Sequence, residues 1–553
     1  MSGRRRFLVG IAGLAGAVGI AAGFLRAHRP RPAPPPEPPL PPDPAFPNAL
    51  KLPGDEGMFG AADASGAFTL VAQPVEHAIL PGKPTRVLSY EMEQHGRRLL
   101  NPLLRARTGT ALRIKFWNSI NEPSIIHWHG LKVDSNNDGH PHYAVPGGGT
   151  YDYQFTVANR AATYWYHPHP HHLTGKQVYH GLAGFFIVED DEELALQKAL
   201  DLKLGATDIP LMLHDRRLDE NGGLVFAPPN EERLHGHYGG QMLVNWTARP
   251  DFRVESRLYR FRVLNGSNAR LYRLAFRRGE QLLDYTVIGT DGGLLDRPRA
   301  VKEAFLAPGE RMDVLLDLRA AARGDAITLV SLPFDAMHQE AVAAGSADAH
   351  AQHGAASKSE EHSHHGAPNV AAGSPAYASD GAALELMRIR VQRRVRYERA
   401  IPQTLSSLGA VPESTFSPRL VVLDQARGKW RINGTSYQAD ATPIVVKRDT
   451  SEIWDIRNVA PTMPHPMHIH GFQFRLVSRS ESPEQQRRLA VDSSGLAATD
   501  LGWKDTLLVW PGETVRIATD FSHPFLGDQV YMVHCHNLEH EDGGMMLNMK
   551  VAT

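Results

Sequence analysis

Histidines spaced two residues apart are the residues of this sequence best suited to metal chemistry. Among such pairs four stand out, two in the first third of the chain and two near its end. Along a β-strand the side chains of residues i and i+2 point to the same side, so each pair would present two imidazoles to one point. Eight converging imidazoles exceed the needs of a structural zinc site and suit a cluster of several metal ions. The pairs are His127 and His129, His167 and His169, His468 and His470, and His534 and His536.

The last pair flanks the single cysteine of the chain, Cys535. The two-residue period points Cys535 to the face opposite its neighbours. There it can join His465 and His540, with Met545 five residues after the second histidine. Cysteine, two histidines and a weakly bound methionine are the ligands of a blue-copper electron-transfer site. The sequence therefore predicts a mononuclear copper linked to the metal cluster through a few covalent bonds, a short path for single electrons.

Composition sets wide limits and excludes some functions. The 553 residues suffice for about two to four domains, and the 22% charged and 42% hydrophobic residues are ordinary for a soluble protein. The formal net charge is −1 with no long basic block, so we expect no nucleic-acid partner. One cysteine excludes a disulfide within the chain.

Short alternating segments separated by turns would position the ligands. Residues 110–118 (TALRIKFWN) and 151–157 (YDYQFTV) alternate as strands do. No long helical period occurs, and 192–202 is the best candidate for a short helix. This pattern is typical of β-sandwiches.

An internal repeat indicates how many sandwiches there are. Residues 114–131 and 454–472 share a strand, an asparagine, a proline-containing loop, a His-x-His pair and a glycine. Residues 261–274 have the same strand and asparagine but no histidines. We therefore expect three related sandwiches, with metal ligands in the first and third and none in the middle one.

The chain resembles the multicopper oxidases over roughly residues 65–553. The motifs HWHG, HPH, HPMHIHG and HCHNLEHEDGGMM stand in that family's order, and all four with this spacing form a very specific signal. GLAGFFIVED, DGGLL and GWKDT point to bacterial periplasmic copper-efflux oxidases and laccases. The resemblance implies an all-β fold of three cupredoxin-like Greek-key β-sandwiches, over residues 61–195, 196–400 and 401–553.

The resemblance also implies four copper ions and a role for each matching residue. Type 1 copper would be bound by His465, Cys535, His540 and Met545, and type 2 copper by His127 and His468. The binuclear type 3 pair would be bound by His129, His167, His169, His470, His534 and His536. Asp138 and Glu541 match acidic residues that the family uses to supply protons. The alternatives for these two are a loop-capping aspartate and a solvated glutamate.

The N-terminus is typical of an export signal. Arginines at 4–6 precede a mildly apolar run that ends at Leu25. We expect a twin-arginine signal in residues 1–28, recognised by the twin-arginine export machinery, with a retained membrane anchor as the alternative. A Pro-rich linker would follow over 29–60, extended over 30–47. The expected location is periplasmic.

Residues 337–380 interrupt the middle sandwich with a segment rich in Ala, Gly, Ser and His. The segment lacks large apolar residues and cannot form a core alone. Its histidines could gather copper ions loosely, or they could be incidental in a surface loop. They are His338, His350, His353, His362, His364 and His365. A further pair, His140 and His142, is interpreted as loop residues rather than ligands.

The predicted enzyme takes electrons singly from a small reductant and reduces dioxygen to water. The reductant would be a cuprous ion or a phenol, acting near His465, which we expect close to the surface. Met463 matches a methionine of the efflux oxidases' cuprous site, but Pro461 stands where an acidic ligand is expected, and their methionine-rich insert is missing. The alternative is a non-catalytic copper-binding or storage protein that uses the histidine-rich segment, although storage needs no electron path.

Overall fold

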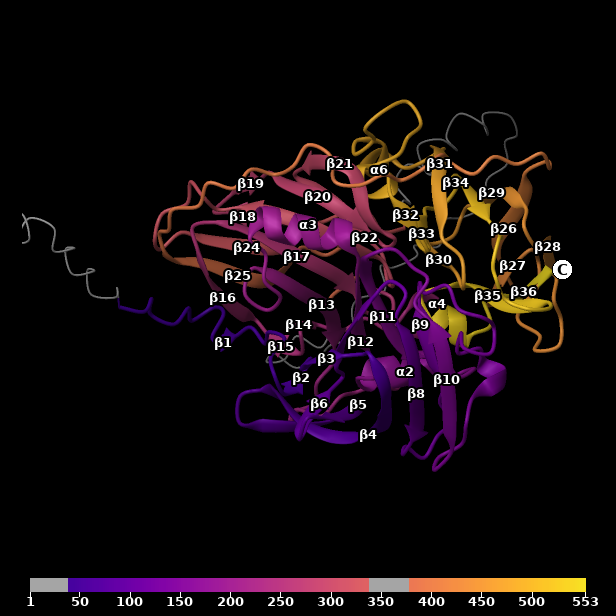
Figure 1. The fold of residues 1–553 in the computed structure, drawn as a ribbon, viewed down its shortest axis with the longest axis horizontal. Coiled ribbons are helices and arrows are strands. Elements are labelled where there is room, and N and C mark those ends of the chain that lie inside the picture. The colour runs from indigo at the N-terminus through magenta and orange to yellow at the C-terminus, as the bar shows by residue number, and fades with distance from the viewer. Residues whose placement is uncertain (1–37, 338–376) are drawn as a thin grey trace, which may run out of the picture. The chain divides into compact units, whose positions relative to one another are not determined.

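Strands in six hydrogen-bonded sheets dominate the structure, a computed structural model that describes residues 38–337 and 377–553. Residues 42–553 cluster as one unit, in which the sheets pair around three main hydrophobic cores (Figure 1). The expected all-β fold of three sandwiches is therefore confirmed. The predicted signal and nearly all of the histidine-rich insertion lie outside the described residues, and the exact domain boundaries stay a prediction.

The first sandwich contains the strands that carry the first two histidine pairs. Along β8 (Ala111–Asn118) every second residue is buried, as the sequence pattern predicted, because only one face of the sheet packs on the core. In β9 (Ile126–His129) and β11 (Ala162–Pro168), which are antiparallel neighbours, His127 lies opposite His167. The six-stranded sheet has the order β10 (Thr150–Thr156), β8, β4 (Gly66–Leu80), β5 (Lys83–Gln94), β6 (Arg97–Leu100) and β2 (Gly57–Met58). The five-stranded sheet has the order β3 (Ala61–Asp63), β7 (Leu103–Arg107), β12 (Gly184–Glu189), β11 and β9.

The middle sandwich is built around β17 (Leu258–Asn265), the strand that repeats the strand-and-asparagine pattern and is buried along its whole length. The sheet of β17 has the order β15 (Thr247–Ala248), β14 (Gln241–Val244), β13 (Asp208–Arg216), β17, β23 (Arg311–Asp317), β20 (Tyr285–Thr290) and β21 (Gly293–Val301). The second sheet has the order β1 (Asn48–Ala49), β16 (Pro250–Glu255), β25 (Leu384–Arg393), β24 (Ala326–Ser331), β18 (Tyr272–Arg278) and β19 (Gln281–Leu283), with β22 (Glu303–Leu306) paired to β18.

The third sandwich carries the last two histidine pairs and the cysteine. In β30 (His465–Ile469) and β35 (Gln529–Cys535), which are antiparallel neighbours, Met467 lies opposite Cys535 and His468 opposite His534. One sheet has the order β27 (Lys429–Ile432), β26 (Arg419–Ala426), β29 (Ser451–Asn458), β34 (Thr514–Asp520), β31 (Phe474–Ser480) and β32 (Trp503–Lys504). The other has the order β28 (Ile444–Lys447), β36 (Met546–Ala552), β35, β30 and β33 (Thr506–Val509).

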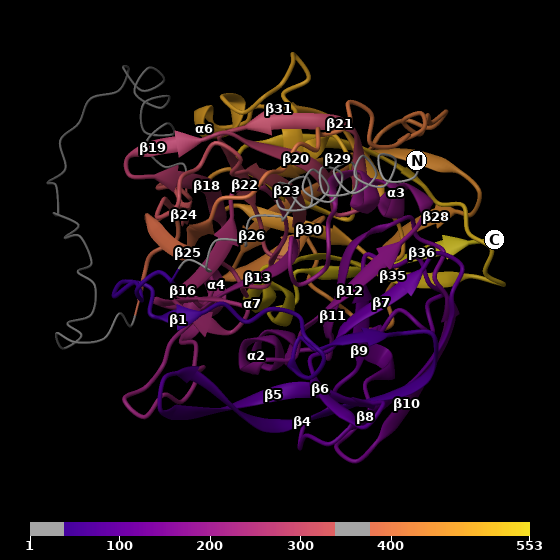
Figure 2. The ribbon, with the colours of Figure 1, turned by 60° about the vertical axis from the view of Figure 1, so that its left-hand side comes forward.

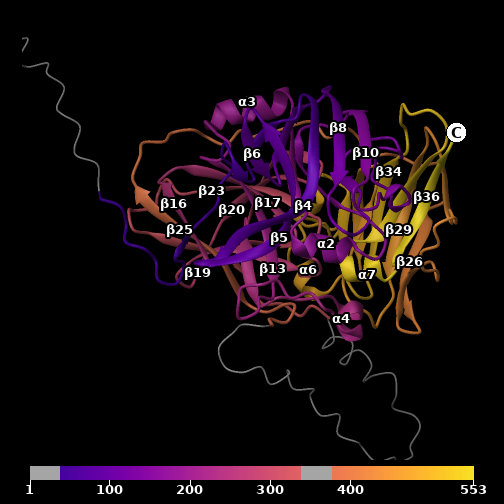
Figure 3. The ribbon, with the colours of Figure 1, turned by 90° about the horizontal axis from the view of Figure 1, so that it is seen from below.

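Helices are few and short among the described residues. They are α2 (Thr174–His180), α3 (Asp191–Leu200), α4 (Asn230–His235), α6 (Glu484–Arg487), α7 (Leu538–Asp542) and the 3₁₀ turns η1 (Pro141–Tyr143) and η2 (Ala498–Asp500). The helix predicted over 192–202 is α3, whose first turn is capped by the Asp190 carboxylate. Both α2 and α4 lie beside α7, so all three sandwiches contribute a helix near the last ligands (Figures 2 and 3). In the part of the chain that the structure describes, no helix is long and apolar enough to cross a membrane.

The end of the predicted linker differs from the expected extended stalk. From Phe46 onward the segment packs against the middle sandwich, where β1 pairs with β16 and the Phe46 ring lies beneath the guanidinium groups of Arg249 and Arg388. Phe46 is buried, because an apolar ring within a proline-rich segment still favours a site away from water.

Candidate copper centres

The four histidine pairs meet at one buried place between the first and third sandwiches. His127 Nε2 lies 3.4 Å from His468 Nε2, and His534 Nε2 lies 3.0 Å from His470 Nε2 and 3.5 Å from His169 Nε2. All of these rings are buried. Because each sandwich supplies four of the eight imidazoles, neither holds a complete set alone.

The eight imidazoles fall into three overlapping groups, in each of which the possible ligand atoms lie within 4.8 Å of one another. One triad takes two histidines from the first sandwich and one from the third, and the other triad reverses this share. The triads are His129, His167 and His536, and His169, His470 and His534; the remaining group is His127, His129 and His468. No group among the described residues includes a side chain of the middle sandwich.

Hydrogen bonds on one ring nitrogen leave the other nitrogen free for a metal. Nδ1 of His127 donates to the Asp138 carbonyl oxygen at 2.7 Å, and Nδ1 of His470 donates to Asp138 Oδ2 at 2.7 Å. Nδ1 of His468 donates to the Asp505 carbonyl oxygen, also at 2.7 Å. Such bonds fix the tautomer and the orientation of metal-binding histidines.

Several ring nitrogens in the cluster are buried with no hydrogen-bond partner. They are Nδ1 of His129, Nε2 of His167, Nδ1 of His169 and both nitrogens of His536. Burial lowers the pKa of His169 and of His536 to about 3, so both rings are neutral and have lone pairs available. Unpartnered buried polar atoms are costly unless something binds them, so this donor set fits bound metal.

Cys535 points away from the cluster into a second group of ligands. Its Sγ lies 3.5 Å from Nδ1 of both His465 and His540. The fully buried Met545 belongs to the same core, and its carbonyl oxygen accepts a hydrogen bond from the Cys535 backbone N–H. Nε2 of His540 donates to the Leu234 carbonyl oxygen of α4, which directs Nδ1 toward the thiol. One cysteine and two imidazoles thus lie together on the side away from the cluster, and Met545 belongs to the same buried core.

His465 is completely buried, so its ring makes no contact with solvent, and its expected closeness to the surface stays a prediction. Strand β27 brings Trp430 over the site, with ring centroids 4.8 Å from His465 and 5.1 Å from His540. The indole Nε1 donates to the same Leu234 carbonyl oxygen at 2.6 Å. Trp430 and α4 therefore form the cover of this group.

Two multicopper oxidase family models match the chain, over residues 82–193 and 413–553, and these ranges contain the four histidine pairs of the cluster and Cys535. The laccase of Bacillus subtilis is 31% identical over 452 residues, which cover 77% of this chain and 79% of that protein. The chain belongs to the multicopper oxidase family. It is therefore an oxidoreductase of the copper-dependent kind that the sequence motifs indicated.

Solved structures of this oxidase family confirm the cupredoxin-like fold. The McoA multicopper oxidase of the hyperthermophile Aquifex aeolicus is 38% identical, with a TM-score of 0.78 over 92% of this chain and 99% of that one. A Campylobacter jejuni multicopper oxidase, described as a metallo-oxidase, is 26% identical, with a TM-score of 0.69 over 92% of this chain and 97% of that one.

The two acidic residues predicted to supply protons both lie against ligands of the cluster. Asp138 binds His127 and His470 as described, and its Oδ1 has no hydrogen-bond partner. Glu541 Oε2 lies 3.2 Å from His534 Nδ1, and Oε1 lies 3.5 Å from His169 Nε2. Burial would raise the pKa of Glu541, but these two histidines lower it overall. Both carboxylates are buried, which does not fit a solvated glutamate, while their role in proton supply stays a prediction.

The neighbouring pair His140 and His142 has structural partners instead of a place among the ligands. His140 Nε2 contacts Asn548 Oδ1 at 3.0 Å, and its Nδ1 accepts a hydrogen bond from the His142 backbone N–H at the start of η1. This arrangement agrees with their interpretation as loop residues.

Sequence reasoning missed the residues that orient the ligands from outside the motifs. Asp505 and Thr506 both contact Nε2 of His129, at 3.0 and 3.1 Å. Asp505 lies in GWKDT, a segment used only as a mark of resemblance. The carbonyl oxygen of Leu234 gives no sequence signal, because every residue has one.

Proposed function

We propose that this multicopper oxidase binds four copper ions and couples one-electron oxidation of a small reductant to the four-electron reduction of dioxygen to water. One observation carries the proposal: Cys535 faces His465 and His540, while its neighbours His534 and His536 face the histidine cluster. A storage site has no use for a thiol that joins two metal centres through a few covalent bonds.

The donor sets support the ligand assignment that follows. Type 1 copper would be held by His465, Cys535, His540 and Met545, and type 2 copper by His127 and His468. The type 3 coppers would each be held by one of the two triads described above. Bound copper would supply one-electron redox chemistry, which these side chains lack.

The remaining residues of the site orient ligands and handle protons. Asp138 holds His127 and His470 through its carbonyl and carboxylate oxygens, and the free Oδ1 is the atom proposed to take up and release a proton. Glu541, between His169 and His534, would do the same on the other side of the cluster. Burial of all these groups excludes bulk water from the place where dioxygen would be reduced.

The proposed reductants are cuprous ion and phenolic compounds. Relatives named laccase and metallo-oxidase support both classes. Because Trp430 and α4 cover both type 1 histidines, electrons from either donor would pass through this cover rather than by direct contact with a ligand.

The test is dioxygen uptake by copper-loaded protein with cuprous ion or a phenol as donor. Each donor is compared in the full chain and in a variant that lacks the histidine-rich segment between Met337 and Tyr377. Uptake with either donor supports the oxidase, and equal uptake without the segment assigns it no part in donor oxidation. A protein that binds copper but consumes no dioxygen would be a storage protein, and the proposal would fail.

We also propose that the enzyme is exported through the twin-arginine route to the periplasm and takes part in copper homeostasis. The N-terminal arginines followed by a mild apolar run support the route. Replacing Arg4–Arg6 by lysines should leave active enzyme in the cytoplasmic fraction. Unchanged periplasmic activity would contradict this route.

A further inference from the structure

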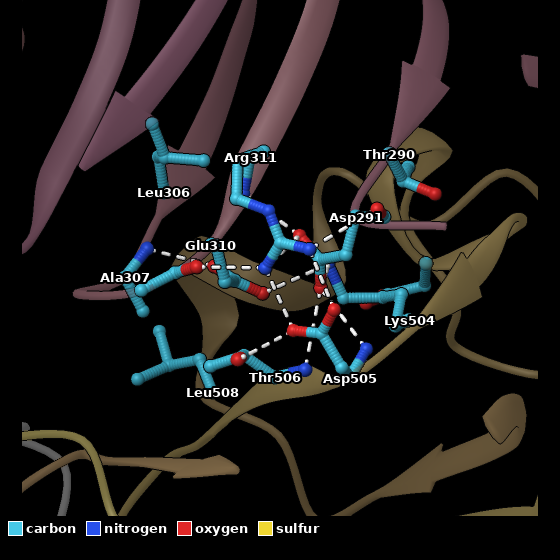
Figure 4. A network of polar contacts seen from close by, with 12 residues as sticks. Thr290, Asp291, Leu306, Ala307, Glu310, Arg311, Lys504, Asp505, Thr506 and Leu508 are labelled. Carbon is cyan, nitrogen blue, oxygen red and sulfur yellow. Dashed lines mark hydrogen bonds and ion pairs between the residues drawn. The ribbon is translucent and has the colours of Figure 1, made fainter. Parts of the chain in front are cut away.

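The carboxylate of Asp505 joins the middle sandwich to the histidine cluster, and Figure 4 shows its contact with Arg311 of the middle sandwich. Asp505 lies just before β33 of the third sandwich and is completely buried. Its Oδ1 accepts a hydrogen bond from His129 Nε2, a ligand of the first sandwich, at 3.0 Å. Its backbone carbonyl accepts one from His468, a ligand of the third. One residue thus orients ligands from both metal-bearing sandwiches.

The partner that holds Asp505 comes from the middle sandwich. Arg311 begins β23 and forms a two-point ion pair with Asp505, which is the strongest geometry for such a pair. All five of its N–H donors are used. Nη1 donates to Asp505 Oδ1 at 2.7 Å and Nη2 donates to Asp505 Oδ2 at 2.5 Å. The other three N–H groups donate to backbone carbonyl oxygens: Nε to Thr163 (2.9 Å), Nη1 to Gly309 (2.9 Å) and Nη2 to Asp291 (3.1 Å). The guanidinium therefore contacts all three sandwiches.

This pair fixes which nitrogen of His129 faces the cluster. Nε2 of His129 is held by Asp505 and Thr506, so its unpartnered Nδ1 is left for metal. The arrangement is the reverse of that in His127, His468 and His470, whose Nδ1 atoms are held from outside. Only an acceptor on the Asp505 side keeps the proton of His129 on Nε2.

Two glycines, Gly130 and Gly309, show that the packing around this pair leaves no space for even a methyl group. A Cβ atom on Gly130 would lie 2.3 Å from Asp505 Oδ2 and 2.9 Å from Arg311 Nη2, and one on Gly309 would lie 2.9 Å from the His536 ring. Both glycines also have positive φ angles, of 86° and 83°. The middle sandwich is therefore in close van der Waals contact with the cluster. A domain that only separated the other two sandwiches would not need such contact.

We infer that Asp505 and Arg311 are positioning residues through which the middle sandwich governs copper binding at the trinuclear cluster, which is the proposed site of the type 2 and type 3 coppers, but not at the type 1 site. This inference rests on the proposed function, because it needs copper at both places. The type 1 ligands lie on the other side of Cys535 and share no hydrogen bond with this pair among the described contacts. Loss of the pair should therefore weaken copper binding at the cluster and leave copper binding at the type 1 site unchanged.

The test is Asp505→Asn in the full chain. An asparagine has the same shape, but its amide group turns a donor toward either Arg311 or His129, both of which already donate. We expect the copper affinity of the trinuclear cluster to fall about 10- to 100-fold, as for other residues that orient ligands. Copper per chain and the type 2 paramagnetic resonance signal should both fall, while the blue thiolate-to-copper absorption stays.

A matched control breaks an equally buried ion pair on the same strand. Asp313 lies two residues after Arg311 and accepts hydrogen bonds from Arg260 and Thr163, neither of which is a copper ligand. Asp313→Asn should lower the unfolding temperature and keep full copper. If Asp505→Asn does not fold, Arg311→Lys replaces it, because lysine keeps the charge and loses the two-point contact.

The outcomes separate this inference from the proposed function. Wild-type protein that binds no copper at the cluster defeats the proposed function. Wild-type protein with four coppers and an Asp505→Asn variant with the same copper content and type 2 signal overturn the inference alone. Equal copper loss in Asp505→Asn and Asp313→Asn would also overturn it, since the pair would then be only structural.

Discussion

Removing copper should make this protein strongly sensitive to acid. The imidazoles proposed as copper ligands are buried, and burial makes it unfavourable for them to accept protons in the folded, copper-free state. Burial lowers the pKa of His169, His465 and His536 to about 3, from an ordinary value of 6.5. The unfolded chain, in contrast, takes up these protons as soon as the pH falls below 6.5. Stability is therefore full above that pH and lost as the pH falls toward the folded values.

The size of the effect depends only on the pKa of each imidazole in the unfolded chain, because the pKa in the folded state lies well below the pH of the experiment. At about pH 5, each imidazole that protonates only in the unfolded chain lowers the free energy of unfolding by about 2 kcal/mol. The three histidines together give about 6 kcal/mol, against a total of about 5 to 15 kcal/mol for ordinary proteins. His129, His167, His468, His470 and His540, whose pKa values are also lowered mainly by burial, add to this loss.

The assay is urea unfolding followed by tryptophan fluorescence at about pH 7.5 and about pH 5, on copper-free and copper-loaded protein. The copper-loaded protein is the control, because it has every other titrating group and its imidazoles are held by metal. We expect the urea midpoint of the copper-free protein to fall sharply at the lower pH and that of the loaded protein to change far less. Equal shifts in both forms would refute the argument that neutral, buried imidazoles control the acid response.

Three substitutions, one of them with a matched control substitution, test other parts of the structure. Cys535→Ser should abolish the blue absorption and dioxygen uptake, since a hydroxyl cannot replace the thiolate ligand; retained turnover would disprove the proposed electron path. Gly130→Ala should lower stability by more than about 1 kcal/mol, because the new methyl group meets Asp505. Gly66→Ala, also at positive φ but with open space around it, should cost less in the same thermal unfolding assay, and an equal cost would assign the effect to backbone strain. Trp430→Phe removes the hydrogen bond to Leu234 and should cost about 0.5 to 1.5 kcal/mol in urea unfolding; an unchanged midpoint would show that this bond does not fasten α4.

Local patterns in the sequence predicted the elements and the ligand residues well. The two-residue period of the histidines required strands or extended chain, and β9, β30 and β35 supply them. Alternation predicted β8, and the helix expected over 192–202 is α3. These predictions depend on side-chain direction along a single segment, which the sequence encodes directly.

Contacts between distant segments could not be predicted in the same way. How the histidines proposed to bind type 3 copper divide into two triads depends on the relative position of the first and third sandwiches. The burial of His465 depends on Trp430 and on the Leu234 carbonyl of another sandwich. The Asp505–Arg311 pair joins residues 194 positions apart. Only the repeat at residues 261–274 indicated that a middle sandwich exists, and nothing in that repeat indicated contact with the histidine cluster.

The division of each triad between the two ends of the chain has a consequence for biosynthesis. A ribosome delivers His127 to His169 long before His465 to His536, and the N-terminal sandwich can fold while the rest is still being made. Until the final segment emerges, the nascent polypeptide carries two histidines of one triad and only one of the other, so neither triad is complete. A truncated translation product that lacks the third sandwich therefore cannot complete either triad.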